Sequence, residues 1–170
     1  MELIPENMVS IHLIDENFLF MDDIFGRYSD KKKYEVKYYP SVDKFISENE
    51  KRNLSRKGIH IVILAVQLNR TDRDLSTDLS SQLNTLFPLI EIIKICHEKE
   101  VEGEYSSLRN GNVLRVVNNE NALLRIDNAV KLVLAKNNLE NKNRIYKQVL
   151  ILLLISLFSS ALFILFSKIS

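Results

Sequence analysis

The stretch Ile59–Leu68, IHIVILAVQL, is the most apolar run in the first 148 residues of the chain, and it is the strongest indication of the fold. It carries no charged side chain and is rich in β-branched residues, which favour strands. Strands of this composition lie in parallel sheets whose two faces are both covered by helices. The stretch therefore predicts a central strand of an α/β domain.

Shorter strand-like runs lie on both sides of this stretch, and helical patterns separate them. The further strands are expected at Val9–Ile14, Tyr34–Tyr39, Leu89–Cys96 and Val113–Val117. Helices are expected from Phe18 to Tyr28, after an N-cap at Ser41, from Leu75 to Leu86, near residues 105–108, and from Ala122 onward. This alternation predicts a doubly wound sheet of five parallel strands, with its functional crevice beyond the carboxyl ends of the strands.

The C-terminal part of the chain differs from this body. Val149–Phe166, VLILLLISLFSSALFILF, contains no charged residue. Counted through Ser167, a helix here is about 28 Å long, close to the thickness of a bilayer core. We therefore expect a transmembrane helix over residues 149–167. Its anchoring residues are taken to be Val149, Leu150, Phe158, Phe163 and Phe166.

The charges around this segment predict its orientation. Lys136, Lys142, Arg144 and Lys147 precede it, whereas Lys168 alone follows it. The positive-inside rule then places the N-terminal domain in the cytoplasm, held to the inner or plasma membrane by one C-terminal helix.

The composition excludes several classes of protein. The chain has 170 residues, and its 23 Lys and Arg nearly balance its 22 Asp and Glu. This near-neutrality argues against a nucleic-acid partner. A single cysteine excludes an internal disulfide and a zinc site of several cysteines. No glycine-rich phosphate loop is present, so no nucleotide cofactor is expected.

The segment 137–148 between the two parts is a polar connector that we expect to be helical. It contains neither Gly nor Pro. Leu132, Leu139, Tyr146 and Leu153 are spaced seven residues apart, which permits a homodimeric stalk. Asn137, Asn138 and Asn141 lower the helix propensity, so a hinge is the competing interpretation.

The body, residues 8–136, resembles a response-regulator receiver domain of the CheY-like type. The segment IHLIDEN resembles the first strand of a receiver, and Asp15 and Glu16 match the acidic pair that holds Mg²⁺ there. HIVILAVQL resembles the third strand, and VLRVVNNENALLRIDNAV resembles the fifth strand and last helix. The resemblance implies the strand order 2-1-3-4-5 and a role in bacterial phosphorelay signal transduction.

The chain departs from the receiver pattern at three positions. Ala65 stands where receivers have the phospho-accepting Asp, and Arg115 where they have Lys. The position where receivers have Ser or Thr is matched best by Cys96, with Ile95 as the alternative. An alanine methyl group cannot accept a phosphoryl group. Asp15 and Glu16 alone would bind Mg²⁺ weakly, because Mg²⁺ requires six oxygen ligands. The sequence therefore predicts a pseudo-receiver that is not an enzyme.

The remaining candidates are assigned to packing. His12, His60 and His97 lack the spacing of metal ligands, and Cys96 is expected to be a buried structural residue. The tyrosines of Tyr34–Tyr39 are expected to pack on the sheet. An acidic pair after a strand is also common at a helix N-terminus, where it interacts with the helix dipole.

Two functions follow from the sequence. The first is a membrane-tethered scaffold or small subunit of a membrane complex, whose partner is a membrane protein such as a sensor kinase. The alternative is an active phosphorelay component or a small-molecule sensor that uses a crevice at Asp15 and Glu16.

Overall fold

A computed structural model describes the backbone of residues 8–16, 18–50, 54, 58–65, 73–96, 109–110 and 112–169. Side chains are described over the same ranges, except at 73–78, 109–110 and 160–169. The chain divides into two compact units, Met1–Leu132 and Val133–Ser170, and each is considered by itself. Residues 97–108, where a short helix was expected, lie outside the described ranges.

The first unit contains a single sheet whose strand order confirms the predicted topology. Five parallel strands follow the order β2-β1-β3-β4-β6, the order of flavodoxin-like folds. They are β1 (Val9–Asp15), β2 (Tyr34–Tyr39), β3 (Ile59–Ala65), β4 (Glu91–Cys96) and β6 (Val113–Val117). The sequence did not predict β5 (Arg109–Asn110). This strand has two residues and pairs antiparallel with β6 at the lateral edge of the sheet.

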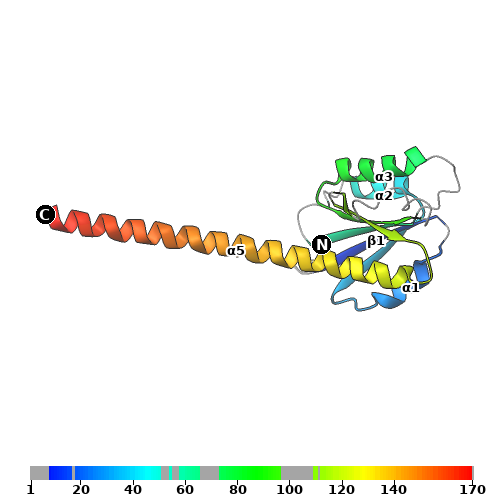
Figure 1. The fold of residues 1–170 in the computed structure, drawn as a ribbon, viewed down its shortest axis with the longest axis horizontal. Coiled ribbons are helices and arrows are strands. Elements are labelled where there is room, and N and C mark those ends of the chain that lie inside the picture. Colours follow the sequence, from blue (N-terminus) through cyan, green and yellow to red (C-terminus); the bar gives the residue numbers. More distant parts are fainter. Residues whose placement is uncertain are drawn as a thin grey trace. The chain divides into compact units, whose positions relative to one another are not determined.

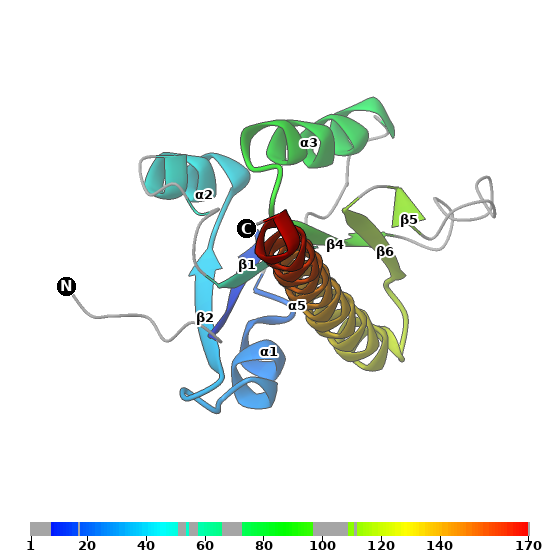
Figure 2. The ribbon, with the colours of Figure 1, turned by 90° about the vertical axis from the view of Figure 1, so that its left-hand side faces the viewer.

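Helices cover both faces of this sheet. Figure 2 shows α2 (Val42–Asn49) and α3 (Arg73–Leu86) together on one face. The other face is covered by α1 (Met21–Arg27) and by the first turns of α5, which spans Ala122–Ile169 (Figures 1 and 2). The central strand is therefore enclosed, as its composition predicts, and β3 is completely buried from Ile61 to Ile63.

One predicted element boundary changes in the structure, and another is only partly described. The third strand was expected to run to Leu68; β3 is described from Ile59 to Ala65, and residues 66–68 lie outside the described ranges. The fourth strand begins at Glu91 rather than Leu89, because Pro88 and Leu89 form a turn after α3. The predicted cap is confirmed, since Lys44 N donates to Ser41 Oγ over 3.2 Å at the start of α2.

The first helix begins later than its apolar spacing predicts. It starts at Met21, and Phe18 lies before it with a φ angle of 57°, which no right-handed helix contains. The backbone N–H of Phe20 donates to Asp15 Oδ2 over 2.9 Å. This hydrogen bond turns the chain back toward the end of β1, so the helix begins only after residue 20.

The second unit consists of helix from Val133 to Ile169, and it includes the connector residues 137–148. Polar contacts follow one turn of this helix, with Asn141 Nδ2 donating to Asn137 Oδ1 over 3.1 Å. Lys136 and Glu140 form an ion pair of 4.0 Å at the same spacing. Such pairs stabilise a helix only slightly in water, by about 0.2–0.5 kcal/mol each.

The apolar end of this helix presents large side chains to its surroundings. Between residues 149 and 158 all the large apolar side chains are more than half exposed: Val149, Leu150, Ile151, Leu152, Leu153, Leu154, Ile155, Leu157 and Phe158. Phe163 and Phe166 of the predicted anchor lie outside the residues whose side chains are described. Within the described part of the chain, no helix has both the length and the apolar character needed to cross a membrane.

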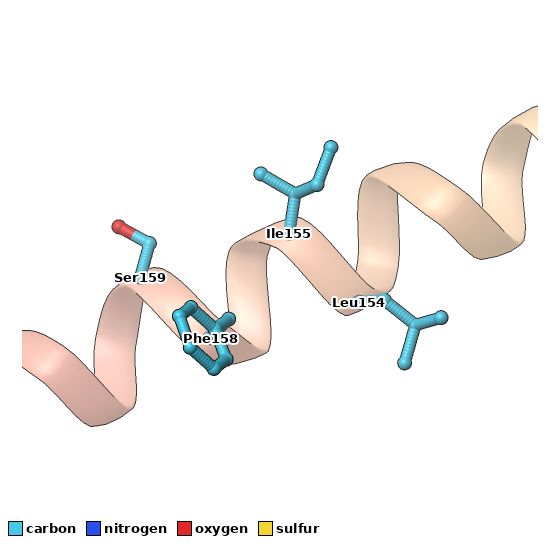
Figure 3. Close-up of a pocket in the computed structure, with 4 residues that line it drawn as sticks. All are labelled: Leu154, Ile155, Phe158 and Ser159. Atoms are coloured by element: carbon cyan, nitrogen blue, oxygen red, sulfur yellow. The ribbon is translucent and has the colours of Figure 1, made fainter.

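A shallow groove runs along this helix at Leu154, Ile155, Phe158 and Ser159. Figure 3 shows Ile155 and Ser159 projecting from one side of the ribbon, and Leu154 and Phe158 from another. Each pair is four residues apart, so the groove separates two neighbouring ridges of one helix. It is a helix surface rather than an enclosed cavity.

Candidate functional site

The carboxyl ends of β1 and β3 lie side by side, at the end of the sheet where the parallel strands terminate. Asp15 and Ala65 are the last residues of these strands, and they are direct neighbours in the parallel register. Cys96 and Val117 end β4 and β6 in the same way and are likewise neighbours. The strand ends that the sequence singles out are therefore adjacent in pairs along this end of the sheet.

The structure separates the acidic pair into a buried and an exposed member. Asp15 has no exposed surface, and its Oδ2 accepts the hydrogen bond from Phe20 N. Its carbonyl oxygen accepts a hydrogen bond of 2.6 Å from Tyr38 Oη. Glu16, by contrast, is exposed to solvent. Asp15 therefore fixes the connection between β1 and α1, in addition to any role at this end of the sheet.

Ala65, the residue that the sequence matched to the phospho-accepting position of receivers, lies directly beside Asp15. Its side chain is 5% exposed, so a methyl group closes this part of the sheet end. A methyl group has no lone pair for phosphorus or for a metal ion. Gln67 and Asn69, which follow in the sequence, lie outside the described residues.

Among the described residues, the side chains at this end of the sheet supply few of the oxygen ligands that a magnesium ion needs. Mg²⁺ requires a nearly octahedral shell of oxygen ligands. Asp15 uses one carboxylate oxygen for Phe20 N, and the Ala65 side chain has no oxygen. Across the described residues, no three His, Cys, Asp or Glu side chains are grouped so that they could hold a metal ion.

Cys96 and Arg115 lie on the other half of the sheet. Cys96 is 3% exposed, and its Sγ donates to the carbonyl oxygen of Lys94 over 3.9 Å. Arg115 is half-buried within β6, two residues before the strand ends, and its register partner is Lys94. The Cys96 carbonyl oxygen accepts a hydrogen bond of 2.7 Å from Asn118 N, which continues the β4–β6 pairing beyond the strand. His97 lies outside the described residues.

Two side-chain pairs were not predicted from the sequence. The rings of Phe18 and Tyr38 stack with a centroid distance of 5.0 Å at the β1 end of the sheet. His12 and His60 meet on the face covered by α2, with 3.3 Å between His12 Nε2 and His60 Nδ1. The period-2 alternation of β1 and β3 was the available signal for the second pair, but it leaves the register of the two strands open.

No protein-family model and no curated protein matches the chain. Two solved structures are similar to the chain. One is FixJ-N, at 16% identity and a TM-score of 0.49, with 74% of this chain and 92% of the other covered.

The second is the signal receiver domain of a LuxO repressor protein from Vibrio parahaemolyticus. It has 13% identity and a TM-score of 0.49, and the match covers 79% of this chain and 95% of the other. The strand order and parallel pairing of the chain itself define it as a doubly wound α/β domain with a flavodoxin-like sheet.

Proposed function

We propose that residues 8–136 form a protein-interaction module for signal transduction, built on a receiver-like sheet that does not transfer phosphoryl groups. The observation that carries this proposal is the placement of Ala65 directly beside Asp15 at the carboxyl ends of β1 and β3. A phospho-accepting carboxylate belongs at this position in the receiver pattern, and a buried methyl group replaces it.

The proposal includes a tether to the membrane through the C-terminal helix. Nine large apolar side chains between Val149 and Phe158 are more than half exposed in the isolated chain. Leaving so much apolar surface in water costs on the order of 10 kcal/mol, which a bilayer or a partner would recover. The uncharged sequence 149–166 favours the bilayer, with the sheet domain on the cytoplasmic side of the inner or plasma membrane.

The partner of such a module is a membrane protein, such as a sensor kinase or another subunit of a membrane complex. Tethering confines both proteins to one surface and raises their effective concentration. A second copy of the chain fits the same role through α5. Its seven-residue series Leu132, Leu139, Tyr146 and Leu153 is exposed along its whole length.

Phosphoryl transfer is tested with an acyl phosphate and Mg²⁺ on the full chain in detergent. Intact-mass measurement is expected to show no added phosphoryl group on the native protein. An Ala65→Asp variant, which restores a carboxylate beside Asp15, is the comparison, and Ala65→Asn controls for size. An acyl phosphate formed on any Asp or Glu of the native chain would overturn the proposal.

The tether is tested by carbonate extraction of membranes that contain the full chain. The native protein is expected to stay in the membrane pellet. Leu152→Asp combined with Phe158→Asp places two charges in the apolar segment, each costing about 3 kcal/mol in a bilayer, and should release the chain. Tyr146→Asp lies before that segment and serves as the control. Release of the native chain by carbonate would contradict the tether.

A further inference from the structure

A small exposed surface lies where β1 passes into α1, and it consists of Phe18, Leu19 and Tyr38. We call these three residues the aromatic ledge. Phe18 is 59% exposed and Leu19 is 50% exposed, and the ring of Phe18 lies on that of Tyr38 with an interplanar angle of 25°. Such a stacked pair contributes about 0.5–1.5 kcal/mol beyond its buried area. The ledge is therefore an ordered apolar surface open to solvent.

Asp15 holds the ledge from two sides. Tyr38 Oη donates to the Asp15 carbonyl oxygen over 2.6 Å, and Phe20 N donates to Asp15 Oδ2 over 2.9 Å. Phe20 itself is buried, which fixes the chain directly after Leu19. These contacts set the positions of both aromatic rings before any partner arrives, so little conformational entropy is lost on binding.

The conformation of Phe18 is costly for folding alone. Its φ angle of 57° is in the left-handed region, which costs an L-residue about 1–2 kcal/mol and suits Gly or Asn. Gly or Asn would make this turn at a lower cost, so the turn alone does not explain a large, exposed aromatic residue at position 18. Strained backbone of this kind is concentrated at binding and catalytic sites. The strained backbone and the exposed ring of Phe18 together favour a contact outside the domain.

The charge of the segment that carries Phe18 and Leu19 indicates what the ledge contacts. Glu16, Asp22 and Asp23 are all exposed, and residues 15–26 contain no Lys or Arg. The whole chain has a net charge of +1, so this negative segment is a local feature. Aromatic faces attract Arg and Lys side chains, by about 0.5–1 kcal/mol at exposed sites and more when water is excluded. The exposed carboxylates of the same segment would add electrostatic steering of a positively charged partner.

From these features we infer that the aromatic ledge docks a segment of a protein partner that carries Arg or Lys beside an apolar side chain. The inference rests on the proposed function, because it names the surface through which the interaction module acts. Anionic lipid headgroups are disfavoured by the same three carboxylates, since like charges repel.

The test uses a photoreactive p-benzoylphenylalanine at Leu19 of the full chain, in membranes of the cells that naturally make it. This position leaves the Phe18–Tyr38 stack intact. The matched control carries the same residue at Leu89, which is 65% exposed in the turn before β4, at the opposite ends of the strands. Mass spectrometry identifies the cross-linked peptide. We expect a protein segment containing Arg or Lys at Leu19 and not at Leu89.

Two further variants make the result specific to the ledge. Phe18→Gly removes the aromatic ring and relieves the positive φ, and should reduce the Leu19 cross-link by about tenfold. Reversing the charges of Glu16, Asp22 and Asp23 to Lys should reduce it similarly. Their fold is checked by tyrosine fluorescence in urea. A cross-link to lipid, to a segment without Arg or Lys, or one that both variants leave unchanged would overturn the inference.

The outcomes also separate this inference from the proposed function. A partner that co-purifies stoichiometrically with the full chain but is not cross-linked at Leu19 overturns the ledge alone. The absence of any stoichiometric partner, together with no cross-link, overturns both the ledge and the interaction module.

Discussion

His12 Nε2 lies 3.3 Å from His60 Nδ1, joining residues that are 48 positions apart in the chain. In the β1–β3 register His12 faces Val62, so His60 is its diagonal neighbour on the same face of the sheet. The rings of Phe45 and Tyr39 pack against His12, with centroids 5.4 Å and 5.9 Å away. At least one ring must be neutral for this contact, because one nitrogen has to accept the shared hydrogen.

This pair predicts a loss of stability in acid. Burial, with smaller contributions from the charges of His60 and Lys37, lowers the pKa of His12 from 6.5 to about 3. Between these two pH values His12 is protonated in the unfolded chain but not in the folded chain. The free energy of unfolding therefore falls as the pH drops from about 6.5 toward 3. The full effect is on the order of 5 kcal/mol.

The pH effect is measured by urea unfolding of the full chain between pH 7 and pH 5, above the range in which carboxylates titrate. Tyrosine fluorescence reports the transition, since the chain has no Trp. His12→Leu is the comparison variant. It should flatten the slope by about 1.4 kcal/mol per pH unit. It also removes His12 Nδ1, a buried atom with no hydrogen-bond partner among the described residues. Equal slopes in both proteins would refute the assignment.

Asp15 is expected to matter for the β1–α1 connection whether or not any ligand binds. Asp15→Ala leaves the Phe20 N–H without its acceptor in a fully buried place, which costs about 1–3 kcal/mol. Asp15→Asn keeps an acceptor oxygen and should lose less. Amide hydrogen exchange over residues 18–24 should accelerate in the Ala variant first. Unchanged exchange there would show that the hydrogen bond does not order the loop.

Asn49 is a buried polar residue at the end of α2 that forms two hydrogen bonds. It is 1% exposed, and its Nδ2 donates to Phe45 O over 2.8 Å and to Tyr39 Oη over 3.2 Å. We expect Asn49→Ala and Tyr39→Phe each to lower the free energy of unfolding by about 1 kcal/mol. The double variant should lose less than the sum, because both changes remove the same contact. Strict additivity in urea unfolding would argue against this hydrogen bond.

Asp127 connects α5 to the end of α1. Its carboxylate lies 2.7 Å from Lys131 Nζ and 3.9 Å from Arg27 Nη1, and Tyr28 Oη donates to it over 3.4 Å. The hydrogen bond from Lys131 and the positive charges lower the pKa of Asp127 against the opposing effect of burial. Its contribution to stability is therefore present above the ordinary carboxyl pKa and is lost as the pH falls through the lowered value.

Asp127→Asn tests this contribution. Because Lys131 and Arg27 are substantially exposed, we expect a loss of only about 1 kcal/mol at pH 7. The difference from the native chain should disappear once the pH lies below the lowered pKa of Asp127, where the carboxylate is protonated in both the folded and the unfolded state. The i, i+4 pair Lys44–Glu48 on α2 offers a fully surface comparison, and Glu48→Gln should change stability less.

The apolar pattern of the sequence predicted the sheet because buried parallel strands are nearly continuous apolar runs. Ile59–Leu68 and Val9–Ile14 were recognisable for that reason, and their ends brought Asp15 and Ala65 together. The two-residue strand Arg109–Asn110 is too short to have a pattern. It forms only because β6 offers an unpaired edge.

The details of the candidate site depended on facts that a sequence pattern does not contain. The spacing of Phe18 and Leu19 fits a helix, but α1 begins only at Met21. The hydrogen bond from Phe20 N to Asp15 Oδ2 holds the residues before Met21 in a non-helical connection. The same bond buried Asp15 while Glu16 stayed exposed. The membrane segment, the connector boundaries and the partner remain predictions.

The two edges of the sheet bear on how many copies of this domain can be crowded together without aggregating. At one edge the two-residue β5 pairs with Val113 and Leu114 of β6, and at the other β2 carries an ion pair of 2.8 Å between Lys37 and Glu35. A strand from a neighbouring copy that docked on β2 would have to strip water from this pair. Both features therefore discourage the extension of the sheet by a strand from a neighbouring copy.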